Sequence, residues 1–211
     1  MNERVWAPIT ISHLEILKHV ALDELKRFLN EAGTPQGKYS VYKNRLIAVC
    51  LCQGAAQYFF ELWLMGKEPE DKVVEVKQKE IEEKSLKVKD KIVLSGIKDI
   101  DIWFFFEEHP EIEIPHIRNM RKSIILEIPG LGKRRIDFMK KMIAKSILEN
   151  STSIEEIIRK YLALETNSAR FLSEKSIIGV YPEKLFAKPI WKVKRIISNK
   201  PLQRTGGYAG R

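Results

Sequence analysis

The sequence predicts an α/β (α+β) fold, in which a mixed β-sheet is flanked by helices and helical segments lie towards both ends of the chain. Apolar residues recur at helical spacing over residues 11–32 and again after Ser151, which predicts an amphipathic helix in each place. Between them, runs rich in β-branched and aromatic residues lie near residues 46–52, 97–106 and 123–139. Such runs are typical of strands, and the last is interrupted by a turn that predicts a hairpin.

Composition indicates a folded, basic protein. The 211 residues are 44% hydrophobic and 31% charged, which suffices for one substantial core and excludes a largely disordered chain. The formal net charge is +9. A basic protein favours polyanionic partners such as nucleic acid, nucleotides or acidic proteins.

We expect a cytoplasmic protein with no membrane partner. Residues 1–4 do not open a signal peptide, and the longest apolar stretch, near residues 100–106, is too short to cross a bilayer. Cys50 and Cys52 lie two positions apart in an apolar segment. That arrangement is typical of buried thiols in a reducing compartment.

Three parts are expected along the chain. Residues 1–150 form the core with its N-terminal helix, residues 151–200 form a C-terminal helical segment, and residues 201–211 form a flexible tail. Ser153 is placed to cap the first helix of the second part. The tail is rich in glycine and lacks a packing signal.

An Asp-Ile-Asp triplet stands where the most apolar predicted strand begins. Side chains alternate along a strand, so Asp99 and Asp101 project from one face while Ile100 and Ile102 project from the other. Two neighbouring carboxylates repel each other unless a cation lies between them, and a divalent metal ion supplies that charge. The alternative is that both acids face water or pair with lysines.

The sequence of residues 46–63 is compatible with two structures. Cysteine and β-branched residues give way to Gly54, then to small and aromatic residues, which fits a short buried strand, a turn and a helix. Glycine at such a junction lets the backbone approach a phosphate at the helix N-terminus. One continuous buried helix, with Gly54 as a close-packing point, remains equally compatible with the pattern.

Charges are segregated along the second half of the chain. Residues 99–113 carry six acids and no lysine or arginine, whereas residues 118–145 carry nine bases with only Glu127 and Asp137 as acids. An acidic site beside a basic arm is what binding a metal ion together with a polyphosphate requires. For Asp137, a salt bridge to Arg135 or to a lysine is the alternative.

A second basic run covers residues 184–204, with seven bases and no acid. This run is the best candidate for a phosphate or RNA contact surface. The alternative is an amphipathic helix whose basic face is merely solvated.

Three motifs, in this order, resemble the nucleotidyltransferase superfamily of the polymerase-β type, and come closest to its abortive-infection toxin-like branch. They are the turn Gln53-Gly54-Ala55-Ala56, the paired-carboxylate strand Asp99-Ile100-Asp101, and the strand Arg135-Ile136-Asp137-Phe138. The resemblance covers roughly residues 45–190. It departs from the family where Gln53 replaces a first glycine, and where Asp99 lies 45 positions after Gly54. Ser95-Gly96 is an alternative phosphate turn.

The resemblance implies a metal-dependent enzyme that transfers an NMP from an NTP to an acceptor hydroxyl on RNA, protein or a small molecule. Asp99, Asp101 and Asp137 would be the catalytic residues and the ligands of Mg²⁺ (or Mn²⁺). The nucleotide-binding residues implied are Gln53, Gly54, Lys98 and Lys188, although Lys188 lies one position away from the family's usual lysine. The implied partners are a nucleotide, RNA and a cognate protein.

Two other classes stay open. The chain could be a catalytically inactive protein of the nucleotidyltransferase fold that binds nucleic acid or a protein partner. It could also be an unrelated α/β scaffold whose acids are structural.

Overall fold

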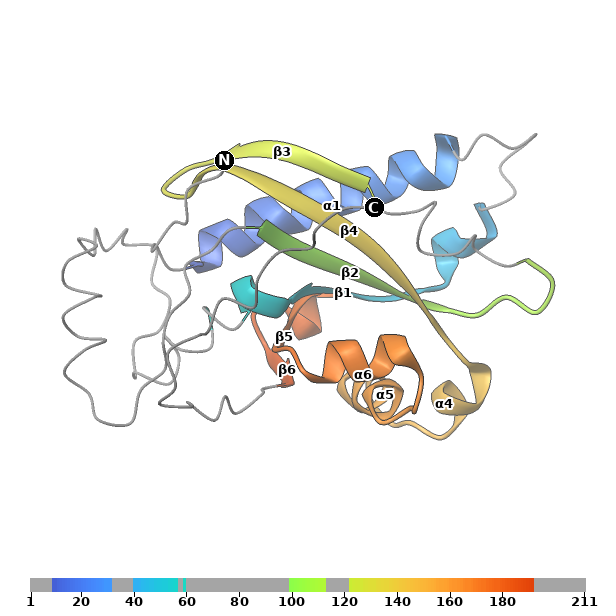
Figure 1. Cartoon of the computed structure of the whole chain (residues 1–211). Helices are drawn as coiled ribbons and strands as arrows, with labels where there is room; N and C mark the ends of the chain where they lie inside the picture. Colours follow the sequence, from blue (N-terminus) through green and yellow to red (C-terminus); the bar gives the residue numbers. More distant parts are fainter. Residues whose placement is uncertain (1–8, 32–39, 57–58, 60–98, 113–121, 192–211) are drawn as a thin grey trace, which may run out of the picture.

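The computed structural model describes residues 9–31, 40–56, 59, 99–112 and 122–191 (Figure 1). Several expectations fall outside these residues, namely the tail 201–211, the end of the second basic run, Ser95-Gly96 and Lys98. No helix in the described part of the chain is long and apolar enough to cross a membrane.

The first element is the helix α1, Ile11–Glu31, which confirms the predicted N-terminal helix. Thr10 caps it, since its Oγ1 accepts a hydrogen bond from the backbone N–H of His13 at 3.3 Å. Leu14, Leu17 and Ala21 recur at helical spacing and are fully buried, so one face of α1 packs on the sheet.

Six strands form one mixed sheet in the order β3-β4-β2-β1-β5-β6. The strands are β1 (Leu46–Cys52), β2 (Asp99–Glu107), β3 (Lys122–Ile128), β4 (Gly132–Ile143), β5 (Ile177–Tyr181) and β6 (Pro189–Trp191). A short 3₁₀-helix, η1 (Ser40–Asn44), precedes β1. The central pair, β2 and β4, is parallel, and all other pairs are antiparallel. The mixed sheet flanked by helices confirms the predicted fold class.

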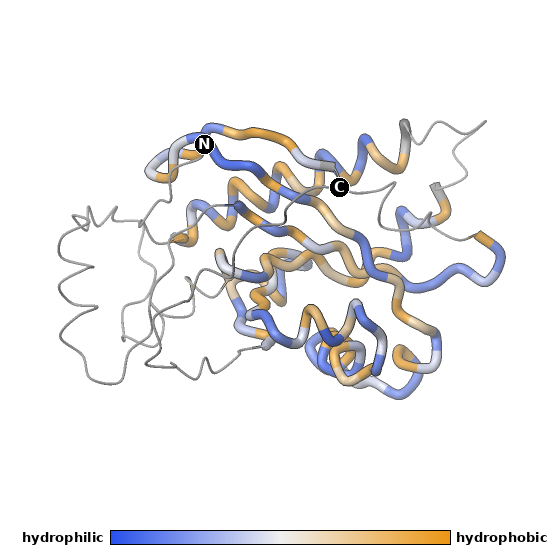
Figure 2. Tube along the Cα trace, in the orientation of Figure 1, coloured by the Kyte–Doolittle hydropathy of each residue, from blue (hydrophilic) through white to orange (hydrophobic). Residues whose placement is uncertain are grey.

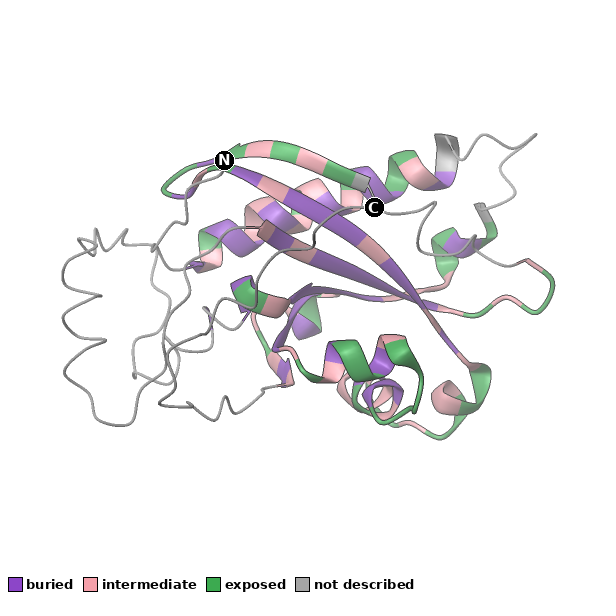
Figure 3. Cartoon of the chain, in the orientation of Figure 1, coloured by how far each residue is buried: buried purple, intermediate pink, exposed green. Residues whose placement is uncertain are grey.

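Each face of the sheet has its own apolar cluster and its own helices. Ile100, Ile102 and Phe104 on β2 pack with α1, on what we call the α1 face. Trp103 and Phe105 point the other way, to a cluster that includes residues of two short helices, α5 (Ile154–Leu162) and α6 (Asn167–Ser173). We call this the α5–α6 face. Figure 3 shows β1, β2 and β4 largely buried between the layers, and Figure 2 shows that β4 nevertheless starts on hydrophilic residues.

The segment after β1 settles the two interpretations of residues 46–63 for the described part. The strand ends at Cys52, and residues 53–56 are already helical. A single continuous helix is therefore excluded, and the strand–turn–helix prediction is confirmed.

The C-terminal segment is helical only in its first half. Ser153 caps α5 as predicted, by accepting from the N–H of Glu156, and the small helix α4 (Lys145–Glu149) precedes it. The prediction of a helical segment over 151–200 is wrong for β5 and β6, which join the main sheet. Their β-branched residues suit a sheet edge, and Pro182 and Pro189 limit the helix between them to one 3₁₀ turn, η3 (Glu183–Leu185).

Candidate functional site

The parallel pair β2·β4 brings the three predicted carboxylates together. Asp99 is in register with Arg135, and Asp101 is in register with Asp137. Residues in register on neighbouring strands project to the same face. All four side chains therefore lie on the α5–α6 face, in two adjoining pairs.

Arg135 lies between two of these acids. Its Nη2 is 2.9 Å from Oδ2 of Asp99 and 3.2 Å from Oδ2 of Asp137. Asp137 is the more buried acid, with 2% of its side chain exposed, against 22% for Asp99. The alternative considered for Asp137, a salt bridge to Arg135, is thus present in the structure.

Ser123 is a site residue that sequence reasoning missed. Its Oγ donates a hydrogen bond to Oδ1 of Asp137, from the neighbouring strand β3. The sequence contains the information to find it. In a hairpin whose turn lies between Ile128 and Gly132, residues equally distant from the turn face each other, which pairs Ser123 with Asp137. The hydrogen bond fixes the orientation of a buried carboxylate.

The donor chemistry of the cluster suits a hard cation. Carboxylate oxygens of three aspartates and a hydroxyl oxygen are the ligand types that Mg²⁺ prefers. Within the described residues, however, no group of three or more His, Cys, Asp or Glu side chains is arranged to hold a metal ion. The positive charge between Asp99 and Asp137 is that of Arg135.

The turn predicted to hold phosphates lies beside the carboxylates. Cys52, the last residue of β1, is in register with Asp101, so residues 53–56 leave the sheet at this point. Gln53 has a left-handed φ of 64° and donates its N–H to the carbonyl of Ser176 at 3.0 Å. Gly54 is exposed, and a Cβ built on it would meet nothing within 4 Å. Gly54, at the start of this helix, is therefore open to solvent.

Lys188 does not join the site. It precedes β6, and its carbonyl accepts the N–H of Gly179 on β5. Two strands, β1 and β5, separate it from β2, and neighbouring strands lie about 4.8 Å apart. The run that follows Pro182 folds as a single 3₁₀ turn rather than as a long helix, which places Lys188 beside β6 and away from the acids.

An aromatic and cationic stack adjoins the acids on the same face. Trp103 lies two residues after Asp101 on β2, and its ring stacks on Phe171 of α6, with centroids 6.4 Å apart. Lys141 places its Nζ 4.5 Å from the centroid of the Trp103 ring. Only 4% of Lys141 is exposed, and this burial lowers the pKa of its amine to about 8.

The two cysteines are buried on the same face, as predicted. Burial raises the pKa of both thiols, and the nearby carboxylate of Asp101 adds to the effect on Cys52. Both therefore stay protonated thiols rather than thiolate ligands or nucleophiles at neutral pH.

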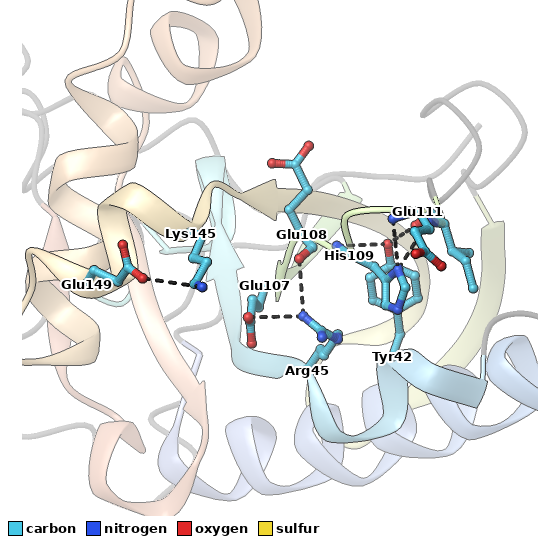
Figure 4. Close-up of polar contacts among 9 residues, drawn as sticks. Tyr42, Arg45, Glu107, Glu108, His109, Glu111, Lys145 and Glu149 are labelled. Carbon is cyan, nitrogen blue, oxygen red and sulfur yellow. Dashed lines mark hydrogen bonds and ion pairs between the residues drawn. The ribbon is translucent and has the colours of Figure 1, made fainter.

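In its described part, residues 99–112, the acid-rich segment does not form one site. Glu107, at the far end of β2, pairs with Arg45 at 3.0 Å, and Arg45 also donates to the carbonyl of Glu108 (Figure 4). Glu107 lies eight positions after Asp99 along the strand, roughly 26 Å at the usual rise. The ring of His109 accepts the N–H groups of Glu111 and Ile112, which closes the loop after β2. These contacts organise a chain reversal.

In the described part of the basic arm, residues 122–145, the bases do not form an exposed stripe. Arg134, Lys140 and Lys141 are buried, and Lys140 lies over the ring of Phe28. Lys145 pairs with Glu149 at 3.5 Å. Long basic side chains here cover apolar surface with their stems instead of presenting a row of charges to a polyanion.

No family model, curated protein or solved structure matches this chain.

Proposed function

We propose that the protein is a metal-dependent nucleotidyltransferase, which transfers an NMP from an NTP to an acceptor hydroxyl. The observation that carries the proposal is the register of the β2·β4 pair, because it gathers Asp99, Asp101 and Asp137 on one face. Sequence reasoning selected these three acids from segments 36 residues apart. Acids gathered from separate strands at one point indicate a site more strongly than a local Asp-x-Asp does.

Each element of the site has a role in this proposal. Asp99 and Asp101 from β2, with Asp137 from β4, would hold Mg²⁺ or Mn²⁺. The bound metal would neutralise charge on the triphosphate and lower the pKa of the attacking hydroxyl. Ser123 orients Asp137 through its hydrogen bond. The helix start at Gly54 lies next to the end of β1, where Cys52 is in register with Asp101, and would be the phosphate-binding turn.

Nucleotidyl transfer asks the protein for positioning and charge rather than for covalent chemistry. The carboxylates project from a sheet that is buried between two layers, so their strands are held in place by packing on both faces. A rigid sheet end beside a helix start supplies the positioning that such a reaction needs.

The test is label transfer from an NTP marked on its α-phosphate, in the presence of Mn²⁺ and either total RNA or the protein itself. We expect transfer with release of pyrophosphate by the wild-type protein and its loss in Asp101→Asn. Glu174→Gln is the matched control. Glu174 is exposed beside α6, and its substitution removes one negative charge, as Asp101→Asn does. Loss in both variants, or in neither, would contradict the assignment.

Two observations favour a second candidate, a catalytically inactive protein of the same fold that binds nucleic acid or a protein partner. Arg135 already neutralises Asp99 and Asp137, and the turn carries Gln53 where the family has glycine. This candidate predicts RNA or protein binding that is insensitive to Mn²⁺ and NTP. A gel-shift assay with and without Mn²⁺ separates it from the transferase.

A further inference from the structure

The two outer strands of the sheet differ in how well they are protected against pairing with a further strand. The strand β6 has only three residues and begins on Pro189, and both features hinder the addition of another strand. The strand β3 has seven residues, contains no proline, and runs in unbroken register along β4. Within the described residues, no strand lies on its other side. A long and regular edge of this kind is a template for another strand.

The most exposed large hydrophobic side chain of the described residues lies at the midpoint of this edge. Ile125 is 73% exposed, and it is the fourth of the seven residues of β3. Exposed and half-buried residues alternate along the strand (Figure 3). A β-branched side chain on an open strand edge favours pairing, because a cross-strand neighbour would cover it.

The sequence of β3 is complementary to itself about this midpoint. If two copies of β3 pair antiparallel over their full length, a two-fold axis passes through Ile125, and the two copies of Ile125 lie opposite each other. Ile124 then lies opposite Leu126 of the second copy, and both are half-buried residues of the α1 face. Ser123 lies opposite Glu127 of the second copy. Apolar residues thus meet apolar ones, and no pair places like charges opposite each other.

A shift of the pairing removes this match. The smallest shift that keeps the faces of both copies aligned is two residues. It places Ile125 opposite Glu127 in one direction and opposite Ser123 in the other. The apolar side chain then faces a polar one in either case. Because the match is a property of β3 paired with itself, it indicates a second copy of the chain rather than an unrelated peptide.

We propose that β3 pairs with β3 of a second copy of this chain, antiparallel and centred on Ile125, so that the two sheets join into one. The contact is isologous and closes at two copies, because each copy uses the same edge. The axis is perpendicular to the sheet, so the α5–α6 faces of both copies lie on one side. Glu127 of the second copy then lies opposite Ser123, and the interface adjoins Asp137, which Ser123 contacts. The proposal does not depend on the nucleotidyltransferase assignment.

The first test measures the mass of the full-length protein by sedimentation velocity over a wide range of concentration. Ile125→Lys places two like charges opposite each other across the axis. The side chain is exposed in the single chain, so the fold should be kept, and circular dichroism checks this. Leu164→Lys is the control, because Leu164 is also an exposed apolar residue and lies outside β3. We expect wild type and Leu164→Lys to form dimers, and Ile125→Lys to raise the dimer dissociation constant by roughly tenfold or more.

The second test examines the register by disulfide formation under mild oxidation. Residues directly opposite each other in an antiparallel pair have Cα atoms about 4.5–5.5 Å apart, which a disulfide can span. Ile125→Cys should therefore give a covalent dimer on a non-reducing gel. Glu127→Cys should not, because the two copies of Glu127 lie four positions apart along the strand, roughly 14 Å. The native Cys50 and Cys52 are buried and do not compete.

The two tests decide the proposal together. A wild-type protein that stays monomeric would overturn it and would show that this edge does not pair with a second copy. Dimers that Ile125→Lys leaves as stable as wild type would also overturn it, because the interface would then lie elsewhere. A covalent dimer from Glu127→Cys but not from Ile125→Cys would refute the register centred on Ile125.

Discussion

Replacing Asp137 by asparagine tests how the buried acid is held. Asparagine preserves the shape of the side chain and its ability to accept from Ser123, but it removes the charge. A hydrogen bond to a charged group is worth about 1 kcal/mol more than a neutral one, so the contact with Ser123 weakens by that amount. The pair with Arg135 adds about 0.5 kcal/mol, because the arginine is 42% exposed and its charge is screened.

Relief of repulsion between Asp137 and its register neighbour Asp101 offsets part of this loss. The net expectation is a destabilisation of about 1 kcal/mol, or a fall in Tm of about 2–4 °C for a chain of this length. Urea unfolding and thermal melts at neutral pH, without metal, measure it, with Glu174→Gln as the control. An Asp137→Asn protein as stable as wild type, or more stable, would show that repulsion dominates and that Ser123 and Arg135 do not hold the acid.

Three further predictions concern the frame of the site. Gly179→Ala should destabilise the protein by about 3 kcal/mol or more, the scale of a severe steric change, because the new Cβ would lie 2.1 Å from the carbonyl oxygen of Leu185. Urea titration measures the loss. Gly54→Ala is the control, because a Cβ at Gly54 meets no atom within 4 Å. Gln53→Gly should stabilise the fold by about 1 kcal/mol, since glycine adopts a φ of 64° without strain, and unchanged or lower stability would refute a strained turn. The pKa of Lys141 is about 8 in the folded protein and 10.5 as its ordinary value, so between these pH values the folded state binds fewer protons than the unfolded state. The free energy of unfolding should therefore rise with pH over that window. The rise should vanish in Lys141→Met.

Much of the architecture follows from local patterns. The helical period of residues 11–32, the cap at Ser153, and the turn between β3 and β4 each encode their element directly, because the sequence period matches the backbone period. Here local preference and tertiary structure agree. The junction at residues 53–54 was left open by the local pattern, and the pairing of β1 with β2 and β5 decides it.

The errors arose where sequence neighbours separate in space. Residues 99–113 looked like one acidic site, yet strand geometry puts Asp99 and Glu107 at opposite ends of β2. The nine bases of residues 118–145 looked like a surface arm, yet alternation along β4 buries several of them on the two faces of the sheet. One-dimensional charge counts do not register this alternation.

The site itself was partly accessible from sequence. The alternation rule put Asp99 and Asp101 on one face, but their register with Arg135 and Asp137 depends on the parallel pairing of β2 with β4. That pairing is non-local, and no local pattern specifies it. Lys188 was misplaced for the same reason, since the strands β5 and β6 were read as helix.

The most direct test of the carboxylate site is a crystal structure of the protein with Mn²⁺ and a non-hydrolysable NTP analogue. The account predicts an anomalous scattering peak within coordinating distance of Asp99, Asp101 and Asp137. Anomalous density elsewhere, with Arg135 still bridging Asp99 and Asp137, would contradict it.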